Sequence, residues 1–166
     1  MALQKRIIND RYQDFTKQWL INNKVRVFID GVDTTDIPTQ ELNKHYKRFE
    51  IYQWSTLQQK YVLRPIVPNT KLHEKGKIGK CTYYQVNITS GTKGHRKSQG
   101  IPLHRIVYVW FNDILPAYNN TNEKLEILHN YRYHNDYIKD NHILNLRLDT
   151  AKQNRAERQG AINQYR

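Results

Sequence analysis

Three side chains in the last third of the 166-residue chain have the types and the order that hydrolysis of a phosphodiester requires. His129 ends an apolar run, Asn145 lies inside HILNLRL (142–148), and Asn154 follows further along. Hydrolysis with one divalent ion needs a general base for water and a cation that neutralises the phosphate, both within about 3 Å of the reacting atoms. Taken singly, the three are equally typical of a half-buried histidine, a turn cap and an exposed helix residue. Their order and spacing therefore carry the prediction.

The general base has two candidates. A histidine with an unperturbed pKa of about 6.5 is largely neutral at pH 7, which suits a base. His129 follows the apolar run LEIL (125–128), as the end of a strand would, and leaves a long loop before Asn145. His134 begins His-Asn-Asp (134–136) and leaves a shorter loop. The preceding strand favours His129, and His134 stays the alternative.

The stretch NHILNLRLDTAKQN (141–154) resembles the HNH nucleases, within them the phage and homing type whose motif ends in asparagine. The segment IPLHRIVYVWF (101–111) is similar to the one that precedes the active site in that group, so the resemblance covers about a third of the chain. It implies a metal-dependent DNA endonuclease. His129 or His134 would be the base, Asn145 would brace the loop that presents it, and Asn154 would bind the metal.

The metal ligands depart from the family pattern. Most members have an aspartate directly before the base, whereas this chain has Leu128 before His129 and Tyr133 before His134. The resemblance then implies that Asn154 holds Mg²⁺ or Mn²⁺ together with phosphate oxygens and water, and with one of the aspartates of this region. Few protein ligands suffice because Mg²⁺ keeps several waters. The candidate aspartates are Asp136, Asp140 and Asp149.

The elements that must position these residues form a strand–loop–strand–helix pattern over about 124–158. KLEILH (124–129) and HILNLRL (142–148) have the composition of strands, and a polar stretch separates them. Thr150 and Gln153 have the spacing of a capping box, in which the threonine side chain accepts from the amide of residue 153. The sequence therefore predicts a C-terminal ββα-metal hairpin.

The rest of the chain completes an α+β prediction with N-terminal helices and central β-hairpins. Residues 4–22 repeat apolar residues at helical spacing, 24–30 alternate as a strand does, and a second helix is expected near Pro38 with Leu42, Tyr46 and Phe49 buried. From Tyr61, short extended runs and glycine turns predict hairpins, and 101–111 is either a strand or a buried helix. We expect a supporting or DNA-contacting region over 1–60 and a nuclease domain over 61–166.

The charge of the chain points to a polyanionic partner. Its net charge is +12, and the sequence pI is about 9.8. Residues 61–100 hold 8 lysines and arginines against 1 acidic residue, so this stretch is the first candidate to contact phosphates. We predict double-stranded DNA as the partner. The candidate DNA-binding residues are Lys75, Lys77, Lys80, Lys93, Arg96, Lys97, Arg105, Lys152, Arg155 and Arg158.

Composition narrows the classes of protein. No apolar window is long enough to span a membrane, and the stretch MALQKRIINDRYQ has no secretion-signal core, which predicts a cytoplasmic protein of a bacterial or phage-infected cell. Cys81 is the single cysteine, which excludes an internal disulfide and a zinc site built on paired cysteines. Two alternatives to the nuclease stay open: a non-catalytic nucleic-acid-binding protein on a degenerate HNH scaffold, and a basic structural protein.

Overall fold

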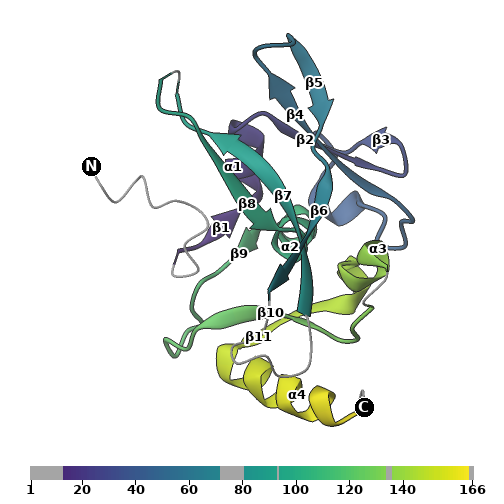
Figure 1. Ribbon diagram of the computed structural model, residues 1–166, viewed down its shortest axis with the longest axis vertical. Coiled ribbons are helices and arrows are strands. Elements are labelled where there is room, and N and C mark those ends of the chain that lie inside the picture. The colour runs from purple at the N-terminus through teal and green to yellow at the C-terminus, as the bar shows by residue number, and fades with distance from the viewer. Residues whose placement is uncertain (1–12, 72–80, 93, 134–135, 165–166) are drawn as a thin grey trace.

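Helices and strands are mixed along the chain in an α+β arrangement, as predicted (Figure 1). The structure is a computed structural model, and it describes residues 13–71, 81–92, 94–133 and 136–164. Two antiparallel sheets form most of it, a four-stranded one of order β3-β2-β4-β5 and a three-stranded one of order β6-β7-β8. Their strands are β2 (Val25–Ile29), β3 (Val32–Asp33), β4 (Phe49–Ser55), β5 (Lys60–Leu63), β6 (Ile66–Lys71), β7 (Cys81–Ser90) and β8 (Lys97–Pro102).

The N-terminal helix is shorter than expected. Helix α1 spans only Lys17–Asn22, and it begins where Thr16 Oγ1 accepts from Trp19 N at 3.1 Å. The preceding residues Phe15 and Thr16 form strand β1 (Phe15–Thr16), which pairs with β9 (Ile114–Leu115). This pairing holds the fully buried Phe15 in extended backbone, so the helix cannot include it. The earlier part of the predicted helix, residues 4–12, lies outside the described residues.

The second helix predicted near Pro38 was wrong. Only a 3₁₀ turn, η2 (Thr39–Glu41), follows Pro38, and Phe49 already begins strand β4. The loop is fixed by Asp30, whose Oδ1 accepts from the amides of Lys47 and Arg48 at 2.9 and 2.8 Å. Leu42, Tyr46 and Phe49 are nevertheless buried, as predicted, because the loop places Leu42 and Tyr46 on the core and strand β4 places Phe49 there.

Tyr46 connects this loop to the C-terminal part of the chain. Its ring stacks on His142 with the ring centres 4.1 Å apart, and its backbone oxygen lies 2.8 Å from His142 Nε2. Its hydroxyl accepts from the amide of Ile143 at 3.0 Å. The loop over residues 42–49 and the segment before β11 are therefore one packed unit.

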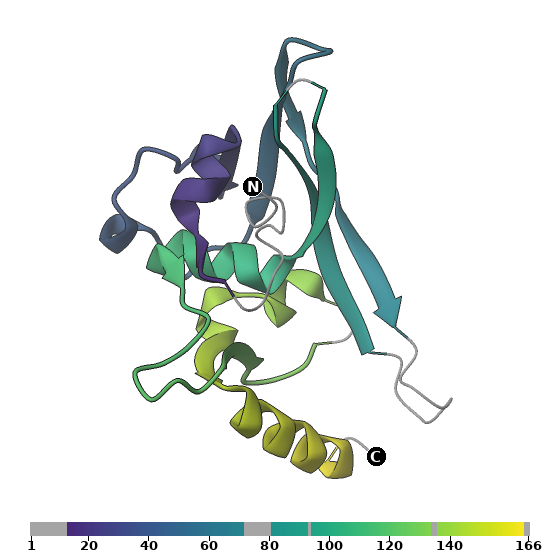
Figure 2. The ribbon, with the colours of Figure 1, turned by 90° about the vertical axis from the view of Figure 1, so that its left-hand side faces the viewer.

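A buried helix, α2 (Leu103–Asn112), runs through the centre of the molecule (Figures 1 and 2). The apolar run 101–111 thus ends strand β8 and continues as a helix rather than as a strand. Trp110 is fully buried on α2, and its Nε1 donates to Thr34 Oγ1 at 2.9 Å. Helix α2 contacts β7, β8, β10 and the turn before β11, so it links the sheets to the C-terminal hairpin.

The expected boundary near residue 60 falls inside one hairpin. Strands β4 and β5 pair across it, with Ser55 opposite Lys60. The core cluster takes residues from both sides, among them Val27, Ile51, Ile88 and Ile106, all fully buried. The two halves of the chain therefore share one hydrophobic core.

The C-terminal part has the predicted order of strand, loop, strand and helix. Strand β10 (Leu125–His129) pairs antiparallel with β11 (Leu146–Thr150), and α4 (Ala151–Gln164) follows directly. Thr150 Oγ1 accepts from Gln153 N at 3.1 Å, as the capping box predicts. The second strand starts later than expected, because residues 143–145 form the 3₁₀ turn η4 (Ile143–Asn145), and the loop contains a short helix, α3 (Tyr137–Asp140). Among the described residues, none of the helices is both long and apolar enough to cross a membrane.

Candidate functional site

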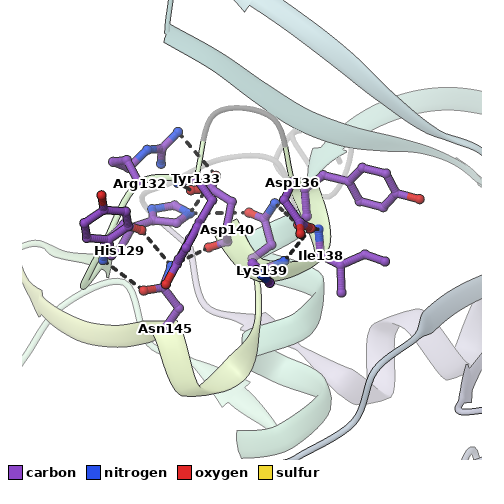
Figure 3. A network of polar contacts seen from close by, with 11 residues as sticks. His129, Arg132, Tyr133, Asp136, Ile138, Lys139, Asp140 and Asn145 are labelled. Atoms are coloured by element: carbon purple, nitrogen blue, oxygen red, sulfur yellow. Dashed lines mark hydrogen bonds and ion pairs between the residues drawn. The ribbon is translucent and has the colours of Figure 1, made fainter. Parts of the chain in front are cut away.

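His129 stands at the end of β10, opposite Leu146, next to the polar side chains of the loop that follows (Figure 3). Only 7% of the His129 side chain is exposed. Its Nε2 lies 3.3 Å from Asn141 Oδ1 and 3.8 Å from Asp140 Oδ2. The ring of His104, from α2, packs edge-on against it with the ring centres 5.1 Å apart. The imidazole is thus held between α2 and the loop that follows β10.

The electrostatics of this pocket keep His129 neutral. Burial, together with the nearby Arg132 cation, lowers its pKa to about 3, and the hydrogen bond with Asn141 opposes both effects. Burial likewise lowers the pKa of His104 well below its usual value, with a smaller effect from His129. Both rings therefore lack a positive charge at neutral pH, the state in which a histidine can accept a proton.

Asn145 ties the two ends of the loop that follows His129. Its Nδ2 donates to the backbone oxygens of Tyr131 and Asp140 at 2.7 and 2.8 Å, and its Oδ1 accepts from Tyr131 N at 2.9 Å. Its own carbonyl accepts from Asn130 N at 2.8 Å. One side chain thus holds both the start and the end of the 130–141 loop.

Asp140 supports the same loop from inside. Its Oδ1 accepts from Tyr133 N at 2.9 Å, and its Oδ2 lies 3.4 Å from Arg132 Nη2 (Figure 3). Asp136 caps α3, where its Oδ1 accepts from the amides of Ile138 and Lys139 at 3.1 and 3.0 Å. These two candidate metal ligands, Asp136 and Asp140, therefore use carboxylate oxygens to hold the backbone of the loop. The alternative base, His134, lies outside the described residues.

Asn154 faces a different cluster, on the strand pair that α4 follows. Its Nδ2 donates to Glu126 Oε2 at 2.6 Å. Glu126 on β10 is directly opposite Asp149 on β11, and opposite residues of an antiparallel pair project from the same face. The structure thus brings Asp149, but not Asp136, to the strand pair that Asn154 contacts. Lys124 Nζ lies 4.0 Å from Glu126 Oε1.

The two carboxylates of this cluster are ligands of a type that a hard divalent cation accepts. Glu126 and Asp149 offer carboxylate oxygens, which Mg²⁺ accepts while it keeps several waters. Asn154 turns its amide nitrogen, not its oxygen, toward Glu126, so the amide would have to flip to join them as a ligand. Within the described ranges, no three His, Cys, Asp or Glu side chains gather closely enough to hold a metal ion. A cation here would therefore depend on the two carboxylates, the amide and water.

Sequence reasoning missed Glu126 and Asn141. Glu126 had a signal: it is the charged residue in the apolar run before His129, and strand alternation sets it on the same face as position 128, where the family has its aspartate. Asn141 had none, because its contact with His129 depends on where the loop after β10 places the end of α3. Arg147 of the Asn-Leu-Arg motif pairs with Glu157 and so joins β11 to α4.

The predicted DNA-binding residues divide between two ends of the molecule. Arg96 and Lys97 are exposed where the β7–β8 hairpin begins to close, and Arg96 Nη1 donates to Thr56 Oγ1 of the β4–β5 tip at 2.7 Å. Lys152 and Arg155 are exposed on α4, at the opposite end (Figures 1 and 2). Arg105 is half-buried, with its guanidinium 5.2 Å from the Phe15 ring centre. Arg158 continues α4, and Lys75, Lys77, Lys80 and Lys93 lie outside the described residues.

Comparison with known proteins gave no relatives: no protein-family model, no curated protein and no solved structure matches the chain.

Proposed function

We propose that this protein is a metal-dependent DNA endonuclease of the HNH type, with β10, β11 and α4 as its catalytic unit. The observation that carries the proposal is the brace made by Asn145. This single amide bonds three backbone groups of the loop after His129 and presents that histidine at the end of a strand. The order of strand, braced loop, strand and capped helix supports the same assignment.

His129 is the proposed general base. Burial lowers its pKa to about 3, so it is neutral at pH 7 and has a free nitrogen lone pair. A pKa so far below the working pH also makes His129 a weak base, so the proposed role rests on its place in the motif and not on its pKa. Asn145 acts on the reaction through His129, since it holds the loop that encloses the imidazole. Glu126, Asp149 and Asn154 would hold a divalent ion, Mg²⁺ or Mn²⁺. When bound, this ion supplies charge neutralisation at the scissile phosphate and its leaving oxygen.

Double-stranded DNA is the proposed substrate. The net charge of +12 favours a polyanion, and Lys152 and Arg155 present two exposed cations on the helix that carries Asn154. Phosphates that reach the catalytic unit would pass this helix. Each phosphate neutralised adds about −0.9 to the slope of log K against log salt, so binding is expected to weaken steeply as salt rises.

A second candidate function is nucleic-acid binding without cleavage. Two observations favour it. The His129 side chain is only 7% exposed, and strand alternation puts His129 and Glu126 on opposite faces of β10. In that case His129 is a core residue, and the protein keeps the positive charge that binds nucleic acid but does not cleave it.

Nicking of a supercoiled plasmid separates the two functions. We expect the full chain to nick DNA with Mg²⁺ or Mn²⁺ and to stop when EDTA is added. His129→Gln should abolish nicking while DNA binding persists, and His45→Gln, at an exposed loop position, should retain both. If His134→Gln abolishes nicking instead, the base is His134. Binding without nicking under any divalent ion supports the second candidate.

A further inference from the structure

The side chain of Asn141 has only one favourable orientation. This residue ends α3 and is 3% exposed. Its Nδ2 donates to the backbone oxygen of Tyr137 at 2.9 Å. A carbonyl oxygen accepts and cannot donate, so a flipped amide would put two oxygens against each other. The contact with Tyr137 therefore directs Oδ1 to the other side, toward β10.

This orientation determines where His129 carries its proton. Asn141 Oδ1 lies 3.3 Å from His129 Nε2. The amide oxygen only accepts, so Nε2 must be the donor of this hydrogen bond. A neutral imidazole has a single N–H, and the other nitrogen, Nδ1, then keeps its lone pair.

The other groups around the ring agree with this assignment. Asp140 Oδ2, a second acceptor, lies 3.8 Å from the same Nε2, and Arg132 Nη2 lies 3.4 Å from that carboxylate oxygen. His104 on α2 meets the ring edge-on, and its own pKa is lowered by burial. Because the environment keeps His129 uncharged, its tautomer decides which nitrogen can take a proton.

We propose that Asn141 is a positioning residue that fixes His129 as the Nε2–H tautomer and reserves Nδ1 as the proton acceptor. The use of Nδ1 in catalysis rests on the proposed endonuclease function, whereas the tautomer is a property of the folded chain alone. Asn141 touches neither water nor phosphate in this scheme and acts only through His129.

Nitrogen NMR of the full chain with ¹⁵N-labelled histidine tests the tautomer directly. The signals of His129 are assigned by their loss in His129→Gln. We expect Nε2 to show the shift of a protonated nitrogen and Nδ1 that of an unprotonated one. Asn141→Leu, which has similar volume and no acceptor, should give a mixture of tautomers. Asn141→Gln keeps a carboxamide, with both a donor and an acceptor, and should retain Nε2–H. Asn120→Ala, in an exposed loop, is the control for general effects of substitution.

The nicking assay is the second readout. Asn141→Leu should lower kcat about 10–100-fold with little change in KM, and Asn141→Gln should recover most of the activity. A proton on Nδ1 in the wild-type protein overturns the inference, and so does an unmixed Nε2–H signal in a folded Asn141→Leu. Should Asn141→Leu not fold, the wild-type and Asn141→Gln spectra decide. The expected tautomer in a protein that never nicks DNA supports the positioning role and overturns only the endonuclease proposal.

Discussion

Asn154 and Glu126 meet across the face of the C-terminal hairpin, with Asn154 Nδ2 2.6 Å from Glu126 Oε2. This hydrogen bond joins the first turns of α4 to strand β10. It also brings an amide and a carboxylate to the strand pair that carries Asp149. In a chain that lacks the aspartate expected before the base, Glu126 is the acidic residue that this hydrogen bond holds beside Asn154.

Removing Glu126 is expected to weaken the affinity of the protein for the divalent ion that cleavage needs. Glu126→Ala should raise the Mn²⁺ concentration for half-maximal nicking about tenfold or more, because only one of two carboxylate donors remains. The measurement is the nicking rate across a Mn²⁺ titration. Glu41→Ala, at an exposed position on η2, should leave the titration unchanged. An unshifted titration for Glu126→Ala would assign the metal to other ligands.

Removing the Asn145 amide is expected to loosen the 130–141 loop. Asn145→Ala leaves three backbone groups without their partner, which should lower the free energy of unfolding by about 1–3 kcal/mol. Urea unfolding followed by circular dichroism measures the change, with Asn120→Ala as the exposed control. Nicking should fall together with stability. If nicking were unaffected, the loop would have no part in presenting the base.

The histidine pair should make folding sensitive to mildly acidic pH. The pKa of His129 is about 3 in the folded chain, against about 6.5 when unfolded. Between these values the unfolded chain binds a proton that the folded chain excludes. The effect of His129 on the free energy of unfolding is therefore negligible above about pH 6.5, and it lowers that free energy as the pH falls below this value. Burial of His104 acts in the same direction.

Unfolding at pH 7 and pH 5 tests this linkage. The decrease in stability over this interval should be about 2 kcal/mol from His129, and burial of His104 should add to it. His129→Gln should remove the part of the pH dependence that is due to His129, and Asn120→Ala, at an exposed loop position, is the control for general effects of substitution. A wild-type protein equally stable at both values would contradict the enclosed positions of His104 and His129.

The exposed cations of α4 should dominate the salt dependence of DNA binding near the catalytic unit. The double variant Lys152→Ala, Arg155→Ala is expected to reduce the slope of log K against log salt by about 0.9 for each phosphate that these side chains neutralise. Fluorescence anisotropy with a labelled duplex across a salt series gives the slope. Lys44→Ala, exposed on a loop in the N-terminal region, should leave it unchanged. If all variants gave equal slopes, the DNA would bind to a surface other than α4.

Local signals predicted the parts of the fold that depend on neighbours in sequence. The alternation of Val25, Val27 and Ile29 indicated strand β2, and Thr150 with Gln153 indicated the start of α4, because strand faces and helix caps are set within a few residues. The helix expected near Pro38 failed for the opposite reason. Tyr46 and Phe49 have helical spacing, but Tyr46 is buried from a loop by packing against the distant residues Phe111 and His142, and Phe49 is buried at the start of strand β4.

The candidate site likewise has features that the sequence shows and features that depend on distant contacts. The order and spacing of His129, Asn145 and Asn154 are visible in the sequence, as is the hairpin that carries them. The enclosure of His129 is not visible, because it requires His104 from α2 and Asn141 from the end of α3. The contact of Asn154 with Glu126 is not visible in the sequence either, because it depends on the strand register that sets Glu126 opposite Asp149.

The anchoring of Tyr46 on His142 and Ile143 limits how the protein can be engineered. A fragment of residues 61–166 would lack the stacked ring, the acceptor for the Ile143 amide and the N-terminal part of the shared hydrophobic cluster. Grafting the C-terminal hairpin onto another DNA-binding module would therefore transfer an unsupported loop. The smallest portable unit includes the N-terminal strands, and fusion partners belong at the ends of the intact chain.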